Sequence, residues 1–273
     1  MQTDGKSRRI GLARALSKLG YCSRSQAAEL IRAGRVRLNT KVRRDPETPV
    51  HLERDRIEVD SRAIESEQKV YVMMNKPRGL VTTASDEKDR DTVYSILKRS
   101  GESLPWVAPV GRLDKASEGL LVLTNDSEWG ARVASPETHL EKTYHVQIGT
   151  VADESVLRTM ERGVRTKEGE SLKATCCRVV RAGEKNCWLE ITLDEGKNRQ
   201  IRRMFEALRI EVLRLLRVSI GPVQLGTLAK GTYRRLRPDE KQALDRAMAS
   251  RERRKSRLGP QKNKQASSVQ LEF

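Results

Sequence analysis

The chain is poor in aromatic side chains and contains no long apolar run. Phe, Trp and Tyr together make up only 4% of its 273 residues. No stretch approaches the roughly 18 apolar residues that a membrane-spanning helix needs. The polar residues 1–9 also lack the apolar segment of a secretory signal peptide. These absences predict a cytoplasmic protein with no membrane partner.

Cysteine and histidine are also scarce, with four Cys and three His in the whole chain. Cys176 and Cys177 are adjacent, which is poor geometry for a mutual disulfide, and the other two cysteines stand alone. None of these side chains has the spacing of a metal site. We therefore expect reduced, structural cysteines and no bound metal.

Positive charge is what the chain has in excess. Lys and Arg total 54 against 37 Asp and Glu, which gives a formal net charge of +17. A protein this basic repels itself, so a polyanion is the expected partner. Nucleic acid is the first candidate and an anionic membrane the second. A basic tail on an ordinary enzyme would explain only the arginines and lysines near the end of the chain, because others lie in regularly patterned segments.

The residue pattern divides the chain into two ordered parts and a tail. Residues 8–64 carry two helical stripes and then alternating strands, with Ser23 and Gln26 spaced as a capping box, which predicts a small α/β domain. Residues 70–248 contain more strands than helices without regular alternation, which predicts an α+β fold with a mixed or antiparallel sheet. A helix is expected at its end, over Pro238 to Met248. Residues 249–273 lack periodicity and are expected to be disordered.

The most informative segment runs from Gly111 to Asp126. It places one carboxylate, Asp114, on a loop between a short apolar stretch at 107–110 and a continuous apolar run at 120–124. An isolated acid on such a loop is most often a turn or capping residue. The motif around Asp114 favours a catalytic role instead.

This segment resembles the active-site motif of the bacterial ribosomal RNA pseudouridine synthases. The branch concerned modifies a single uridine in the small- or large-subunit RNA. Four further motifs occur in the family's order, so that the resemblance covers roughly residues 8–240. The five motifs are Gly111-Arg112-Leu113-Asp114 with the Ser117–Asn125 run, Asn75–Gly79, Lys142–Val146, Glu195–Met204 and Leu215–Gly221.

The resemblance implies a reaction and roles for the site residues. The enzyme detaches uracil from its ribose, turns it and rejoins it through a ring carbon, without a cofactor. Asp114 is implied as the catalytic carboxylate, acting either as a nucleophile on the sugar or as the base that removes a sugar proton. Arg202 is implied as its ion-pair partner. The implied contacts to the flipped-out nucleotide are Tyr144, which stacks on the base, Leu215, which lines the pocket, and Arg112, Asn198 and Arg199.

Residues 8–64 are in turn similar to the S4-type RNA-binding domain. The similarity rests on Ser23-Arg24, on Gly34-Arg35-Val36 and on Asn39 before a turn. The family usually carries Gly where this chain has Thr40. The resemblance implies an RNA clamp whose arginines meet phosphates, and the alternative is a solvated basic face. The residues expected to bind RNA are Arg24, Arg35, Arg37 and, from the Asn75–Gly79 motif, Lys76.

Two departures from the family pattern affect the catalytic part. Ala116 stands where relatives commonly carry Asp or Asn, which would loosen a hydrogen bond in the loop. Arg209 replaces a frequent Gly after the helix expected at 198–208, so that helix must end differently or hold Arg209 at strain. Neither departure touches Asp114, Tyr144 or Arg202.

The predicted function is the isomerisation of a specific uridine in ribosomal RNA by a monomeric enzyme. The alternative is a non-catalytic RNA-binding or ribosome-assembly protein, which would not need Asp114, Tyr144 and Arg202 together. An RNA methyltransferase would need a glycine-rich cofactor loop, and no Gly-x-Gly-x-x-Gly occurs. The target RNA stays open, because residues 135–144 resemble the small-subunit enzymes and residues 198–202 the large-subunit ones.

Overall fold

A small N-terminal unit opens the computed structural model, which describes residues 9–83 and 90–258. Its helices α1 (Leu12–Lys18) and α2 (Arg24–Arg32) pack together through fully buried side chains, among them Leu16 and Ile31. Ser23 and Gln26 form the predicted capping box at the start of the second helix. The other elements are β1 (Ile10–Gly11), β2 (Val36–Leu38), β3 (Lys41–Arg43), β4 (Pro49–Val50), β5 (Ile57–Val59) and β6 (Arg62–Ala63).

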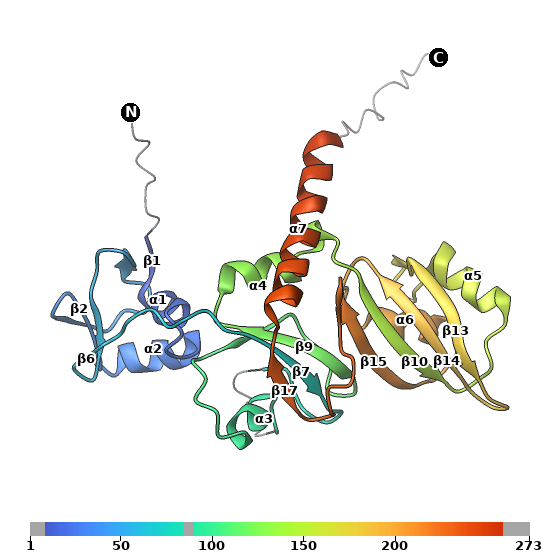
Figure 1. Cartoon of the computed structure of the whole chain (residues 1–273), viewed down its shortest axis with the longest axis horizontal. Helices are drawn as coiled ribbons and strands as arrows, with labels where there is room; N and C mark the ends of the chain where they lie inside the picture. Colours follow the sequence, from blue (N-terminus) through green and yellow to red (C-terminus); the bar gives the residue numbers. More distant parts are fainter. Residues whose placement is uncertain (1–8, 84–89, 259–273) are drawn as a thin grey trace, which may run out of the picture.

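The larger domain is built on a nine-stranded sheet (Figure 1). Its strands are β7 (Tyr71–Lys76), β8 (Ala108–Val110), β9 (Glu118–Thr124), β10 (Lys142–Ile148), β13 (Cys176–Ala182), β14 (Cys187–Leu193), β15 (Val212–Ile220), β16 (Val223–Gln224) and β17 (Tyr233–Arg235). A separate pair is formed by β11 (Val164–Arg165) and β12 (Ser171–Leu172).

The strand order is β13-β14-β10-β15-β9-β7-β17, with β16 beside β15 and β8 beside β9. Only the β15–β9 pair of this sheet is parallel in the described part of the chain, and the other pairs are antiparallel. The sheet is therefore mixed, and the predicted α+β fold is confirmed. The parallel pair lies at the centre of the sheet and joins its two halves.

Helices cover the sheet through three apolar clusters. One cluster joins β10 and β14 to α5 and α6 through Met160 and Phe205. A second joins β9 to α4 and α7 through Trp129 and Leu244, and a third packs α3 against β7 and β9 through Ile96. The bounds are α3 (Tyr94–Arg99), α4 (Ser127–Ala134), α5 (Glu154–Arg162), α6 (Gln200–Ala207), α7 (Pro238–Leu258) and the 3-10 turn η1 (Pro136–Thr138).

The C-terminal helix is longer than the sequence pattern predicts. Helix α7 continues to Leu258 and projects from the body of the domain (Figure 1). The expectation of disorder from residue 249 is therefore wrong for residues 249–258, where Ala, Arg, Glu and Lys have high helix propensity without an apolar period. The rest of the predicted tail lies outside the described residues. Within those residues, no helix combines the length and apolar character that crossing a bilayer requires.

The N-terminal unit contacts the larger domain directly. The ammonium of Lys18 lies 2.6 Å from a carboxylate oxygen of Glu128 at the start of α4. The backbone N–H of Trp106 donates to the carbonyl of Gly20 over 2.9 Å. These contacts place the N-terminal unit beside the start of α4, next to the end of β9 (Figure 1).

Candidate active site

Asp114 lies on the loop that joins β8 to β9, and its side chain is 33% exposed. Gly119 marks the point where β9 approaches β15 most closely. Its φ is +101°, and a Cβ at this position would lie 2.3 Å from the carbonyl oxygen of Arg217. Only glycine fits such an approach, so Gly119 allows the loop and β15 to share one site.

Lys76, the last residue of β7, anchors the Asp114 loop. Its side chain is fully buried, and its ammonium donates to the carbonyls of Pro77 (3.1 Å), Asp114 (3.1 Å) and Ser117 (2.9 Å). Burial lowers the pKa of Lys76 from 10.5 to about 8, and the nearby negative charges of Asp114 and Glu118 oppose that shift. The expectation that Lys76 binds RNA is wrong in this structure, because its ammonium is enclosed by the loop that it holds.

Two arginines flank Asp114 in different ways. Arg199 lies just before α6 with a left-handed backbone (φ 49°), and its Nη1 is 3.7 Å from Asp114 Oδ2. Arg202 is half-buried and donates to the carbonyls of Ala116 (3.1 Å) and Val212 (3.5 Å). The predicted ion pair between Asp114 and Arg202 is therefore not formed, and Arg199 takes that place. The left-handed backbone of Arg199 directs its side chain toward Asp114 before the helix begins. Helical periodicity does not predict this turn.

Burial and the positive charge of Arg199 lower the pKa of Arg202, whereas the carboxylate of Asp114 raises it. By its bond to the Ala116 carbonyl, Arg202 fastens the catalytic loop two residues after Asp114.

A cavity of about 290 Å³ opens beside Asp114. Tyr144 on β10 and Leu215 on β15 form part of its wall, and these strands are neighbours in the sheet. The predicted substrate-binding residues that line the cavity with Asp114 are Arg112, Tyr144, Asn198, Arg199 and Leu215. Arg202 and Lys76 do not line it.

Sequence reasoning missed three residues at this site. Ser117 and Arg217 are buried and line the cavity. Gln200 lines it too, and its side-chain amide donates to Glu195 Oε1 (3.0 Å) and so holds the preceding loop. All three lie inside the recognised motifs, so the signal was present. The motifs alone do not reveal what these side chains contact, since Arg217, for example, donates to the carbonyl of Leu120, 97 residues away.

The other two departures from the family pattern are visible in the backbone. Thr40 adopts a φ of 72°, and Arg209 a φ of 58°. Both lie in the left-handed region that favours glycine. Arg209 is thus held at strain after α6. The sequence had left open whether this would happen or whether the helix would end differently.

The arginines predicted to clamp RNA lie on the surface of the N-terminal unit. Arg24 begins α2, Arg35 precedes β2, and Arg37 lies within β2, and all three are exposed. Arg35 is engaged with the carboxylate of Asp60, to which its Nε donates over 2.8 Å. Arg24 and Arg37 make no side-chain hydrogen bond or ion pair with the described residues.

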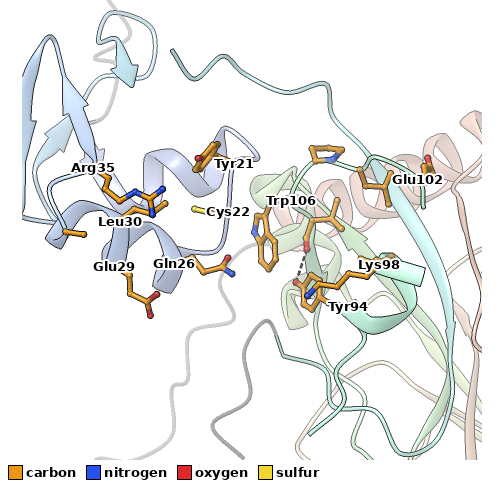
Figure 2. A pocket seen from close by; sticks show the side chains of 15 residues that line it. Tyr21, Cys22, Gln26, Glu29, Leu30, Arg35, Tyr94, Lys98, Glu102 and Trp106 are labelled. Atoms are coloured by element: carbon orange, nitrogen blue, oxygen red, sulfur yellow. Dashed lines mark hydrogen bonds between the residues drawn. The ribbon is translucent and has the colours of Figure 1, made fainter. Parts of the chain in front are cut away.

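A larger cleft, of about 870 Å³, separates the N-terminal unit from the segment that follows α3 (Figure 2). Tyr21 and Arg35 line it on one side, and Trp106 on the other. The ring of Trp106 stacks on Tyr94 with a centroid distance of 4.8 Å. The cleft is distinct from the Asp114 cavity, because the two have no lining residue in common.

The described residues contain no candidate metal site. Within residues 9–83 and 90–258, no group of three or more His, Cys, Asp or Glu side chains lies close enough to hold a metal ion. The side chains that line the cavity include one carboxylate, several cations and an aromatic ring.

Comparison with known proteins agrees with this fold and site. The family described as RNA pseudouridylate synthase matches residues 70–207, and the S4 domain matches residues 10–57. The chain belongs to the RNA pseudouridine synthase family and carries an N-terminal S4 domain.

Relatives of similar length support the assignment. The chain is 36% identical over 239 residues to ribosomal large subunit pseudouridine synthase B of Bacillus subtilis, covering 87% of this chain and 96% of that protein. It is also 36% identical to an RNA pseudouridine synthase of Aquifex aeolicus, over 88% of this chain and 95% of that protein. A crystal structure of a pseudouridylate synthase superposes with a TM-score of 0.58 and 30% identity, over 86% of this chain and 99% of the other.

Proposed function

We propose that this enzyme converts a specific uridine of ribosomal RNA to pseudouridine, with Asp114 as the catalytic carboxylate. The observation that carries the proposal is the cavity, which Asp114 lines together with Tyr144 and its ion-pair partner Arg199 in a chain of this family. The name of the Bacillus subtilis relative makes large-subunit RNA the substrate to test first. A ribosomal RNA substrate would place the enzyme, which we propose to be a monomer, in the cytoplasm.

The proposed reaction begins when the target uridine leaves its helix. A cavity of about 290 Å³ admits a single base rather than a duplex, so the nucleotide is flipped out to reach Asp114. Tyr144 then offers an aromatic face on which the base stacks, and such a face tolerates rotation of the base. Leu215 lines the apolar side of the pocket, and Arg112 and Asn198 contact the nucleotide or its neighbours.

Asp114 starts the chemistry in either of two ways. As a nucleophile it attacks the C1′ atom of the ribose, and as a base it removes the C2′ proton. In both cases the bond from C1′ to N1 breaks and the base separates. The ion pair with Arg199 orients the carboxylate, and Lys76 and Arg202 hold the backbone of its loop.

Residues 8–64 supply the RNA clamp in this proposal, and residues 70–248 the catalytic domain. The exposed Arg24, Arg35 and Arg37 would contact phosphates, which position the RNA without reading its sequence. Membership of the pseudouridine synthase family argues against the alternative of a non-catalytic ribosome-assembly protein.

Mapping pseudouridine after incubation of the purified protein with each ribosomal RNA tests the proposal. We expect one new pseudouridine with the parent protein and none with Asp114→Asn, because the neutral amide is a poor nucleophile and a poor base. Glu184→Gln, at an exposed position outside the cavity, is the matched control and should retain activity. Absence of new pseudouridine in both RNAs would refute the proposed reaction, and turnover by Asp114→Asn would remove Asp114 from it.

A further inference from the structure

Arg217 is a buried cation that the proposed reaction has not yet used. It lies on β15, and only 6% of its surface is exposed. Its Nε donates to the carbonyl of Leu120 over 2.8 Å. Its Nη2 is buried and has no hydrogen-bond partner in the described residues. Within the same residues, no carboxylate lies within ion-pair distance of this guanidinium.

The position of Arg217 connects it to the site. It pairs across the sheet with Tyr144 on one side and with Gly119, at the end of the Asp114 loop, on the other. Its side chain forms part of the wall of the same cavity. In the sheet, Arg217 therefore lies between the strand that carries the proposed stacking ring and the strand that follows the catalytic loop.

A structural role alone accounts poorly for this arrangement. Taking a guanidinium out of water is unfavourable unless a carboxylate or a full set of acceptors compensates it. Arg217 has one carbonyl acceptor, and an apolar side chain would join β15 to β9 without the desolvation. An uncompensated charge in a cavity wall is characteristic of a functional site, where the ligand supplies the missing partner.

Ser117 provides a second, independent observation at the same cavity. Its side chain is 1% exposed, and its buried Oγ has no hydrogen-bond partner in the described part of the chain. It lines the cavity with Arg217. Two buried polar groups of one cavity thus have no hydrogen-bond partner in the described residues, and one of them carries a positive charge.

The chemistry of the reaction identifies that partner. When the bond from C1′ to N1 breaks, its electron pair stays on the base, which leaves as an anion with charge shared by N1 and its carbonyl oxygens. Asp114 is then either esterified to C1′ or protonated by the C2′ hydrogen. The anion turns until C5 faces the sugar, and C5 then bonds to C1′. On the first route the ester between Asp114 and C1′ breaks as this bond forms, and on the second route protonated Asp114 returns its proton to C2′. On both routes the C5 proton is then released. The base is anionic on both routes only while it is detached.

We propose that Arg217 stabilises the detached uracil as an anion and that Ser117 donates a hydrogen bond to it as it turns. The inference rests on the proposed function and deepens it by assigning the residues that hold the intermediate. A fixed cation in an enclosed pocket stabilises charge that develops during the reaction without having to reorganise. Arg217 would therefore act on the chemical step, whereas the exposed arginines act on RNA binding.

Kinetics of Arg217 variants with the full-length protein test the proposal. Arg217→Met should lower the single-turnover rate on the order of 100-fold, the usual effect of removing one such charge-stabilising group, with RNA affinity nearly unchanged. Arg217→Lys keeps the charge and should recover part of the rate. Arg214→Met is the matched control, since Arg214 lies three residues earlier on the same strand, is exposed and binds Glu118 outside the cavity. A parent-like rate for Arg217→Met would overturn the inference.

A binding measurement keeps the test independent of folding and turnover. The probe is 5-nitrouracil, which is ionised near neutral pH, compared with uracil, which is neutral. The parent protein should prefer the ionised probe, and Arg217→Lys should retain that preference. Equal binding of the two probes by the parent would overturn the inference. If the parent forms no pseudouridine, the proposed function fails by itself, and the probe still reports whether the pocket selects an anionic base.

Discussion

The catalytic loop region and the N-terminal unit are both rich in cations, but they use them differently. Around Asp114, the cations Lys76, Arg202 and Arg217 are wholly or partly buried and donate to backbone carbonyls. In the N-terminal unit, most arginines are exposed, and some of them pair with carboxylates, as in Arg35–Asp60 and Arg56–Glu58.

This difference follows from solvent. An exposed arginine is screened by water and salt, so its pairs contribute little and it stays available to phosphates. A buried cation bonded to carbonyls keeps its charge uncompensated, and in surroundings of low dielectric constant that charge acts strongly on a ligand in the cavity. The N-terminal unit is therefore suited to affinity and the loop region to chemistry.

Of the two arginines that flank Asp114, Arg202 is the less exposed, and its replacement should lower the rate most. Arg202→Met removes both a half-buried charge near Asp114 and the anchor of the Ala116 carbonyl, and should lower the single-turnover rate on the order of 100-fold. Arg199→Met removes a pair at 3.7 Å whose arginine is 52% exposed and should have a smaller effect. Rates at saturating RNA decide the order, and a larger loss for Arg199→Met would reverse our view of the two residues.

Removal of the Lys76 ammonium should loosen the catalytic loop. Lys76→Met leaves three buried or partly buried carbonyls without their donor and should reduce the free energy of unfolding by about 1–3 kcal/mol. Urea unfolding measures the loss. Lys115→Met, on the same loop but exposed, is the control and should change stability little.

The pH dependence of stability shows whether Lys76→Met removes a buried, titrating ammonium or only packing contacts. The pKa of Lys76 is about 8 in the folded protein against its ordinary 10.5, so the unfolded chain binds more protons between these values. Stability then rises with pH in that window. The parent protein should gain stability relative to Lys76→Met from pH 8 to pH 10.5, and a constant difference would contradict the enclosed, titrating ammonium.

The pocket ring should contribute through its face rather than its hydroxyl. Tyr144→Phe keeps the stacking surface and should hold the target nearly as well as the parent, whereas Tyr144→Leu should lose about 1–3 kcal/mol of base contact. Single-turnover rates and RNA affinities for both variants test this. Failure of both variants in the chemical step, with RNA binding of Tyr144→Phe preserved, would point to proton transfer by the hydroxyl, and full activity in both would remove Tyr144 from the substrate contact.

The smallest effect on chemistry should come from the N-terminal arginines. Replacing Arg24, Arg35 and Arg37 by Gln should make the salt dependence of RNA binding less steep by about 2 in the log–log slope. The rate at saturating RNA should be unchanged, because none of the three lines the Asp114 cavity. An unaltered slope in a salt titration would show that this face is not the clamp.

Several elements followed directly from local pattern. Polar and apolar side chains alternate over residues 187–193, and β14 buries them in the same alternation. Ser23 and Gln26 form the capping box that their spacing predicted. Helices α4 and α5 and the edge strand β13 were not predicted, although Asp126 and Asp153 cap the two helices. Strand β13 has exposed valines and a register shift, so its alternation is weak. Helix α6 begins two residues later than predicted because Arg199 is left-handed.

The sequence by itself determined the family, the two-part organisation and the position of Asp114 on its loop, because each depends on residues close together in the chain. Only the tertiary structure decided what the cations do. Lys76 is enclosed rather than exposed, Arg199 rather than Arg202 lies against Asp114, and Arg217 has a buried nitrogen without a partner. These outcomes depend on the approach of β9 to β15, and the bond from Arg217 to Leu120 spans 97 residues. The solvation of a charge is set by neighbours of this kind, which local sequence does not specify.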